Sequence, residues 1–363
     1  MPVPRLPFML VAVLVSAFMT VPAASAGSLG FAADDGFQAA QSANTAAVAP
    51  AQTLDAALNT LSATWVRVDV RWNTVAATQP SNARLPGNAA YSWASVEAQL
   101  APVRRILLTQ GAPSVLFSIG GTPDWARSDG GAGGSPGDPA WAPKRTAFQN
   151  FVAAVVAKYG STAAAYEIWP SPNVQAGLRP QRLAGRLVAP GLLRQLTKVA
   201  TTEIRKVTTA PVITGGLART DPANASDTPS VTFLRAMART HIQADAIGVR
   251  LVPPGGVEVP ADPSNLALSD PGTIIANVDA YFPNQGKGIW ETGYATSSAV
   301  TDVAPIAGVS GFLAAAANAR FGVSIWNNLV NTPSAPTSGL YSASAPLDGT
   351  TQKPAWHTWV PPV

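Results

Sequence analysis

Short apolar runs alternate with helical patterns along most of the chain, and this alternation narrows the possible folds more than any other feature. Continuous apolar or period-two runs predict strands at residues 29–32, 65–70, 114–119, 163–169, 212–214, 246–251, 288–291 and 323–326. Helical spacing predicts helices near residues 54–61, 93–109, 145–159, 192–206, 231–240, 271–281 and 306–319. Strands that alternate with helices favour a parallel sheet covered by helices. Eight strands in one domain therefore predict a single (β/α)8 TIM barrel, with its last helix short or missing.

The first 26 residues have the pattern of a secretory signal peptide. Arg5 supplies the positive charge, residues 8–21 form the apolar region, and residues 24–26 are small, as a cleavage site requires. The apolar run is short for a membrane span and lacks a charged flank, so no span is expected after cleavage, and an uncleaved anchor is the alternative. We therefore expect a signal peptide at 1–26, a barrel domain at 27–363, and a secreted or cell-surface protein. The Ala/Gln/Asn-rich residues 33–53 are expected to form a loop after the first strand.

Composition argues against several kinds of partner. The 363 residues include no cysteine and two histidines, and 12% of them are charged, with a net charge of +4. Lysines and arginines are scattered without a basic run, so nucleic-acid binding is not expected. No cofactor or metal is expected either, because His241 and His357 lack neighbouring ligands with suitable spacing. The Gly/Pro-rich stretch 128–143 lacks the Lys-Ser/Thr ending of a phosphate-binding loop.

Period-two alternation predicts which side chains point into the barrel. Five charged residues fall on the inward set: Arg67, Asp69, Glu167, Arg250 and Glu291. Buried charges persist when they are paired, so we expect ion pairs among them. On the last strand the same alternation points Ser324 and Trp326 inward, and Val323 and Ile325 outward.

The segment Tyr166-Glu167-Ile168-Trp169-Pro170-Ser171-Pro172-Asn173 resembles the fourth strand of the clan A glycoside hydrolases. These retaining (β/α)8-barrel enzymes include cellulases and β-xylosidase-like families, and their pattern is Tyr-Glu-Ile-Trp-Asn-Glu-Pro-Asn. The second Glu of that pattern is the general acid/base, and here Ser171 takes its place. Asn173 keeps its family position, and the resemblance makes it a candidate substrate-binding residue. A serine hydroxyl cannot protonate a leaving group near neutral pH as a carboxyl with a raised pKa can. The resemblance implies a sugar site, yet the same motif argues against ordinary hydrolysis.

The segment Glu291-Thr292-Gly293-Tyr294 resembles the seventh strand of the same enzymes, Thr-Glu-x-Gly-Tyr, which carries the nucleophile. In that register Glu291 is the candidate nucleophile. Aligning Ile289-Trp290 with the family's Ile-Trp instead puts Gly293 at the nucleophile position and Glu291 one layer deeper. Both registers point Glu291 into the barrel. Arg67 matches the second-strand arginine that neighbours the nucleophile, and a guanidinium there would keep a carboxylate ionised.

The resemblance also implies positions that contact sugar. Trp326 matches the tryptophan that stacks beneath the sugar, and Trp125 matches an aromatic residue at the rim. Trp72 follows a predicted strand end, where an indole can stack on a pyranose ring. Arg250 takes the place of a sixth-strand histidine that contacts sugar. An oligo- or polysaccharide is therefore the expected partner.

Three functions remain open from the sequence. The first is a secreted, glycoside-hydrolase-like protein that recognises carbohydrate but is catalytically impaired, since Pro170, Ser171 and Arg250 all depart from the family at one site. The second is an active retaining glycosidase or transglycosidase that uses Glu291 on substrates with good leaving groups. The third is ordinary hydrolysis with an acid from a loop, such as Asp124 or Asp129.

Overall fold

A computed structural model of the chain describes residues 28–42, 53–131, 135, 137–252, 262–267, 270–283, 285–295, 312–329 and 347. The predicted signal peptide and nearly all of the chain after the last strand lie outside these residues. The predictions of a cleaved leader and of a short or missing last helix therefore lie outside the described part of the chain. Within these ranges, no helix combines the length and apolar character that a membrane crossing requires.

Eight parallel strands close into a barrel. They are β1 (Ser28–Ala32), β2 (Ala63–Arg71), β3 (Ser114–Gly120), β4 (Ala163–Ile168), β7 (Val212–Thr214), β9 (Ala246–Arg250), β10 (Gly288–Tyr294) and β11 (Phe321–Trp326). Each strand pairs in parallel with the next in this order, and β11 pairs with β1 to complete the circle. The short strand β8 (Leu217–Ala218) also pairs with β9, and β5 (Arg182–Leu183) and β6 (Arg186–Leu187) form a separate hairpin. The predicted (β/α)8 barrel is confirmed.

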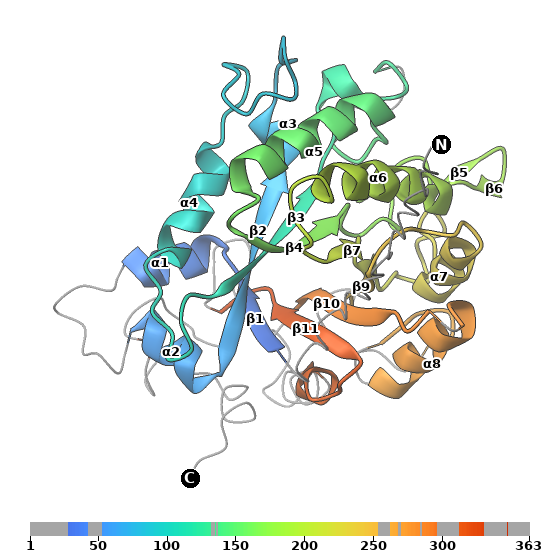
Figure 1. Ribbon diagram of the computed structural model, residues 1–363. Coiled ribbons are helices and arrows are strands. Elements are labelled where there is room, and N and C mark those ends of the chain that lie inside the picture. The colour runs from blue at the N-terminus through green and yellow to red at the C-terminus, as the bar shows by residue number, and fades with distance from the viewer. Residues whose placement is uncertain are drawn as a thin grey trace, which may run out of the picture.

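Helices surround the strands (Figure 1). They include α2 (Leu54–Thr60), α4 (Ala94–Val103), α5 (Arg145–Tyr159), α6 (Ala189–Ile204), α7 (Ser230–Ala238) and α8 (Pro271–Tyr281). The turn α3 (Trp72–Val75) and the 3-10 turn η2 (Asp124–Ala126) follow β2 and β3. The prediction of a loop after the first strand is wrong in part, because the helix α1 (Asp35–Ser42) forms there. Asp34 starts that helix by accepting a hydrogen bond from the Phe37 backbone N–H at 2.8 Å.

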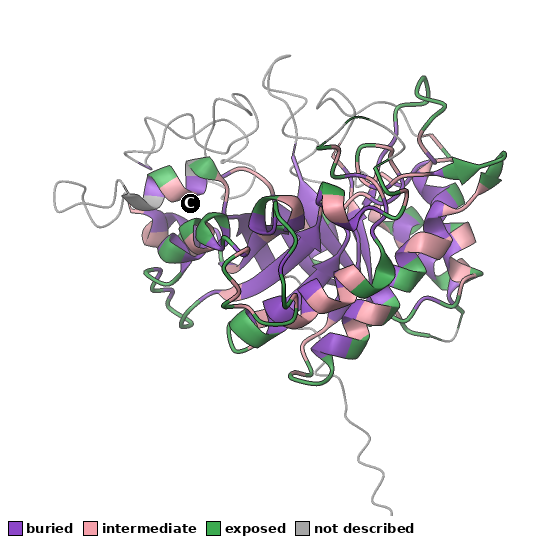
Figure 2. Ribbon diagram, turned by 90° about the horizontal axis from the view of Figure 1, so that it is seen from above, coloured by how far each residue is buried: buried purple, intermediate pink, exposed green. Residues whose placement is uncertain are grey.

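Two apolar layers hold the barrel together. Alternate strand residues such as Val66, Val68 and Val70 pack outward in one large cluster with apolar residues of the helices. A second cluster fills the barrel interior and contains Leu116, Ala165, Ile213, Ala246, Trp290, Val323 and Ile325, with Trp65 packed against it. Figure 2 shows the buried strands at the centre and the exposed surfaces on the outer helices and loops. Successive side chains of a strand point alternately to the outer and the inner layer, so this alternation decides which side chains lie inside the barrel.

The predicted orientation of the last strand is wrong. Val323 and Ile325 belong to the interior cluster, whereas Trp326 packs with Tyr294 and Phe312 in the outer layer, at ring distances of 5.3 Å. The pairing with β10 shifts after Phe321, because Ile289 pairs with Phe321 while Trp290 pairs with Val323. One extra residue on β11 at this shift reverses the alternation of everything that follows.

Candidate functional site

Two adjoining cavities lie at the carboxyl ends of the strands, where (β/α)8 barrels carry their sites. The first has a volume of about 400 Å³ and is lined by the chain around the ends of β3 and β4, including Ser171. The second has a volume of about 560 Å³ and is lined by residues after β1, β2 and β11. They share Asp69, Arg71, Thr74 and Arg250. We call the two together the cleft, and each cavity has a size typical of small-molecule sites.

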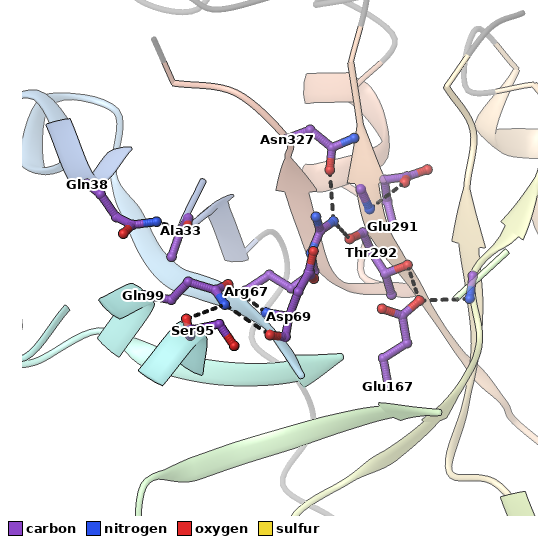
Figure 3. A network of polar contacts seen from close by, with 12 residues as sticks. Ala33, Gln38, Arg67, Asp69, Ser95, Gln99, Glu167, Glu291, Thr292 and Asn327 are labelled. Atoms are coloured by element: carbon purple, nitrogen blue, oxygen red, sulfur yellow. Dashed lines mark hydrogen bonds and ion pairs between the residues drawn. The ribbon is translucent and has the colours of Figure 1, made fainter. Parts of the chain in front are cut away.

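Arg67 is the most highly connected charged residue of the cleft (Figure 3). Its Nε donates to Oδ1 of Asp69 at 2.9 Å, and its Nη1 donates to the Thr292 carbonyl at 2.6 Å and to Oδ1 of Asn327 at 2.8 Å. Arg67 is buried, whereas the Asp69 side chain is 30% exposed. The structure therefore confirms that these two inward-pointing charges form an ion pair.

Asp69 is ionised at neutral pH. Burial raises the pKa of Asp69, but Arg67, Arg250 and Arg71 together outweigh burial and hold the pKa below its usual value. The Gln99 side chain of α4 fixes the Asp69 backbone, accepting from its N–H at 2.8 Å and donating to its carbonyl at 3.0 Å. Gln99 thus fixes the Asp69 backbone, and Arg67 binds its carboxylate where the two cavities adjoin.

Glu167 lies inside the barrel, as its strand position predicts. Its Oε1 accepts hydrogen bonds from Oγ1 of Thr292 at 2.7 Å and from the Gly216 backbone N–H at 2.8 Å. Its Oε2 is buried and has no hydrogen-bond partner among the described residues. The contact with Thr292 also shows that Thr292 points into the barrel.

Glu291 does not point into the barrel, and that prediction is wrong. Its neighbours Trp290 and Thr292 both face the interior, so the alternation directs Glu291 to the other side of β10. Its carboxyl accepts from the backbone N–H groups of Gly293 at 3.0 Å and Leu251 at 3.3 Å, and Figure 3 shows it directed away from the Arg67 guanidinium. Burial raises the pKa of Glu291 to about 8, so the group holds its proton at neutral pH.

Gly293 is the residue of β10 that faces the two arginines. Glu291 pairs with Ser324 and Tyr294 pairs with Trp326, so β10 has one more residue than β11 between these two pairs. The extra residue makes a β-bulge. A Cβ at position 293 would overlap Nη1 of Arg67 and would lie 3.3 Å from Cζ of Arg250. Sequence alignment left two registers open, and the backbone places Gly293, not Glu291, beside Arg67.

Ser171 lines the first cavity and lies in the tight turn that follows β4. Trp169 and Ser171 both adopt left-handed conformations, with φ of 67° and 54°. The Ser171 N–H donates to the Gly216 carbonyl at 2.9 Å, and a Cβ on Gly215 would overlap the Trp169 carbonyl. Left-handed φ at non-glycine residues costs about 1–3 kcal/mol each, so the surrounding contacts must hold this turn.

Two of the predicted tryptophan contacts are replaced by core packing. Trp72 is fully buried, stacks on Phe151 at 5.0 Å and meets Trp125 edge-on at 5.5 Å. Trp326 is buried in the outer layer. Trp125 is half-buried and donates from its indole to the Ala76 carbonyl at 2.8 Å, and it lines neither cavity of the cleft. Contrary to prediction, no indole of this group borders the cleft.

Asn173 also serves the scaffold. Its side chain is fully buried, donates to the carbonyls of Ala218 and Thr228 at 2.8 and 2.9 Å, and accepts from the Ala218 N–H at 2.7 Å. All its polar atoms are engaged by backbone, so the predicted sugar contact is not available. Of the predicted substrate contacts, only Arg250 lines the cleft.

Sequence reasoning missed Asp34, which lines the second cavity. Its Oδ2 accepts from Nδ2 of Asn328 at 2.6 Å, and burial raises its pKa to about 6. The signal was its position, two residues after the end of β1, where barrel strands deliver functional side chains. Among the described residues, no three His, Cys, Asp or Glu side chains are grouped as a metal site requires.

No protein-family model matches the chain, and no curated protein matches it in sequence. Solved structures do match. A family 39 glycoside hydrolase from Bacteroides cellulosilyticus has a TM-score of 0.55 and 14% identity, covering 92% of this chain and 62% of that one. The catalytic domain of a GH30 xylanase from Talaromyces cellulolyticus has a TM-score of 0.52 and 13% identity, covering 92% and 75%. The β-glycosidase from Thermosphaera aggregans has a TM-score of 0.52 and 14% identity, covering 87% and 91%.

The fold is that of these glycoside hydrolase barrels. At these identities the likeness concerns the barrel, and the chemistry of such a barrel depends on the residues at its strand ends. In this barrel those residues are Arg67, Asp69, Arg250, Ser171 and Gly293.

Proposed function

We propose that this protein is a glycoside-hydrolase-like barrel that recognises carbohydrate in its cleft and does not perform ordinary retaining hydrolysis. The likeness to clan A glycoside hydrolases supports a carbohydrate-related function. The cleft supports it further, because it lies at the carboxyl ends of the strands and is lined by polar groups suited to sugar hydroxyls.

One observation carries the proposal: neither strand end presents the carboxyl group that the reaction needs. Retaining hydrolysis requires two carboxyl groups about 5–5.5 Å apart, one as nucleophile and one as acid/base. Here the residue beside Arg67 and Arg250 on β10 is Gly293, and the residue after β4 is Ser171. Loss of general-acid catalysis alone costs about 100- to 10,000-fold in rate.

Glu291 does not make up for this loss. Its carboxyl is neutral at pH 7, is enclosed by the backbone of residues 251 and 293, and has no contact with Arg67. A nucleophilic carboxylate must be ionised and exposed to the sugar. Asp69 is ionised and accessible, and we assign it the role of hydrogen-bond acceptor for sugar hydroxyls.

The alternative is an active retaining glycosidase or transglycosidase that uses Glu291 on good leaving groups. Turnover of 2,4-dinitrophenyl β-glycosides separates the two, because this leaving group needs no protonation. Wild type, Glu291→Gln and the control Ser171→Ala are compared, alongside binding to a glycan array. We expect glycan binding without turnover; turnover that disappears only in Glu291→Gln would establish the alternative.

We also propose that the protein is exported, since its first 26 residues have the signal-peptide pattern. Recovery of a chain that begins at Gly27 from the culture medium would support this. A chain that keeps residue 1 and sediments with membranes would instead indicate an uncleaved anchor.

A further inference from the structure

Three arginines line the cleft, and two of them have no bonded partner. Arg67 donates to Asp69, Thr292 and Asn327. Arg71 and Arg250 each line both cavities, yet neither guanidinium group makes a hydrogen bond or ion pair within the described part of the chain. A guanidinium presents five N–H donors in a planar fork that matches the oxygens of a carboxylate or a sulfate. Two such forks facing one space are a feature that contacts among the described residues do not explain.

The charge of Arg250 is incompletely compensated. Burial is the main influence lowering the pKa of Arg250, and repulsion by Arg67 adds to it, whereas Asp69, Glu167 and Glu291 act in the opposite direction. Glu291 adds no negative charge at neutral pH, because its carboxyl keeps its proton. Among the residues that both cavities share, two arginines face one aspartate, whereas Asp34 and Asp35 line the second cavity alone. An additional anion in this space would therefore be attracted and would relieve the cost of burying Arg250.

The two cavities, of about 400 and 560 Å³, leave room for such an anion beside Arg71 and Arg250. Position 293 has no side chain, and a Cβ there would overlap Nη1 of Arg67 and lie 3.3 Å from Cζ of Arg250, so the glycine lets both guanidinium groups approach β10. Gly216 likewise makes room for the Arg250 side chain, because a Cβ at position 216 would lie 2.9 Å from Cβ of Arg250. At the end of β4, the residue lining the first cavity is the neutral Ser171. Retaining enzymes of this fold carry two acidic side chains in the cleft, whereas this cleft presents the guanidinium groups of Arg71 and Arg250.

We propose that the saccharide bound in the cleft is anionic, and that Arg250 and Arg71 hold its carboxylate or sulfate group beside Asp69. The inference rests on the proposed function, because it names the class of saccharide for that same cleft. Arg250 supplies the half-buried contact, and the exposed Arg71 supplies the outer one. Asp69 accepts hydrogen bonds from the neighbouring sugar hydroxyls. A sugar that carries both an acidic group and free hydroxyls can therefore bind Arg250, Arg71 and Asp69 together.

Matched pairs of saccharides test the proposal. Oligogalacturonate is compared with its methyl ester, and a sulfated galactan oligosaccharide with the unsulfated one, by isothermal titration calorimetry on the full chain. The first pair isolates a carboxylate and the second a sulfate. Arg250→Gln removes the inner charge, Arg250→Lys keeps the charge without the fork, and Arg186→Gln on the β5–β6 hairpin is a charge-matched control outside the cleft. Thermal melts confirm that each variant is folded.

We expect the anionic member of one pair to bind about tenfold more tightly or better than its neutral partner. Arg250→Gln should remove most of that preference, Arg250→Lys should keep part of it, and Arg186→Gln should leave it unchanged. Equal binding of neutral and anionic members would overturn the inference while leaving carbohydrate recognition in place. Absence of binding to both pairs and to every sugar of a broad array would overturn the proposed function with it.

Discussion

Replacing Glu291 with glutamine should make the stability of the folded protein less dependent on pH as the pH rises. Burial raises the pKa of Glu291 from 4.5 to about 8, so the folded protein keeps this proton at a pH where the unfolded chain releases it. The native state then binds more protons than the unfolded state, and the free energy of unfolding falls as pH rises from about 5 to 8. Each pKa unit corresponds to about 1.4 kcal/mol, so the loss amounts to about 5 kcal/mol at most.

The Glu291→Gln variant lacks this titration. At pH 5 both side chains are neutral, and the variant should be less stable by about 1 kcal/mol, because its NH2 group cannot accept from a backbone N–H. At pH 8 the order should reverse, with the variant more stable by about 3 kcal/mol. Urea unfolding at pH 5, 6, 7 and 8, followed by the fluorescence of the ten tryptophans, measures both proteins.

Glu97→Gln is the matched control. Burial raises the pKa of Glu97, but hydrogen bonds from Arg104 and Tyr159 outweigh it and hold the pKa below its ordinary value. The stability difference between wild type and this variant should therefore stay constant from pH 5 to 8. Parallel profiles for wild type and Glu291→Gln would refute the reasoning. A wild type that gained stability over this range would indicate an ionised Glu291, as a nucleophile requires.

Three further changes test other parts of the structure. Gly215→Ala should destabilise the fold by about 3 kcal/mol or more in urea, since its Cβ would overlap the Trp169 carbonyl, and unchanged stability would contradict the turn geometry. Asn173→Ala should cost about 2–4 kcal/mol, because three buried hydrogen bonds to backbone disappear; a loss of glycan affinity with unchanged melting temperature would instead place this side chain in the cleft. Burial raises the pKa of Asp34 to about 6, so wild type should lose stability relative to Asp34→Asn between pH 4 and 6, and pH-independent differences would count against this burial.

The barrel itself was predictable, because its signals are repeated and local. The strand at 212–214 and the helices at 145–159 and 271–281 match β7, α5 and α8 to the residue. Period-two alternation correctly placed Arg67, Asp69 and Glu167 inside, since β2 and β4 run without interruption through those positions.

The orientation of the site residues on the last two strands was not predictable from the same signals. Bulges beside Gly322 and at Thr292–Gly293 each insert one residue, and every side chain after an insertion changes side. The sequence alternation therefore directed the Glu291 carboxyl to the wrong face of β10. Asp34 was not predicted for a different reason. The polar, alanine-rich composition of this segment indicated a loop, whereas the chain forms a short helix that Asp34 caps.

The bulge at Gly293 limits what a protein engineer can do with this barrel. Ser171→Glu would change one residue that lines the cavity, but a glutamate at position 293 would have to displace the Arg67 guanidinium, which is buried and bonded to three groups. Removing Arg67 first would leave Asp69 without its main partner. Under the proposed function, placing both acids of a retaining hydrolase in this cleft takes more than two substitutions, because the step at position 293 disturbs the bonded Arg67. Conversion would require β10 to be redesigned as a whole strand, with the bulge deleted and the facing arginines replaced together.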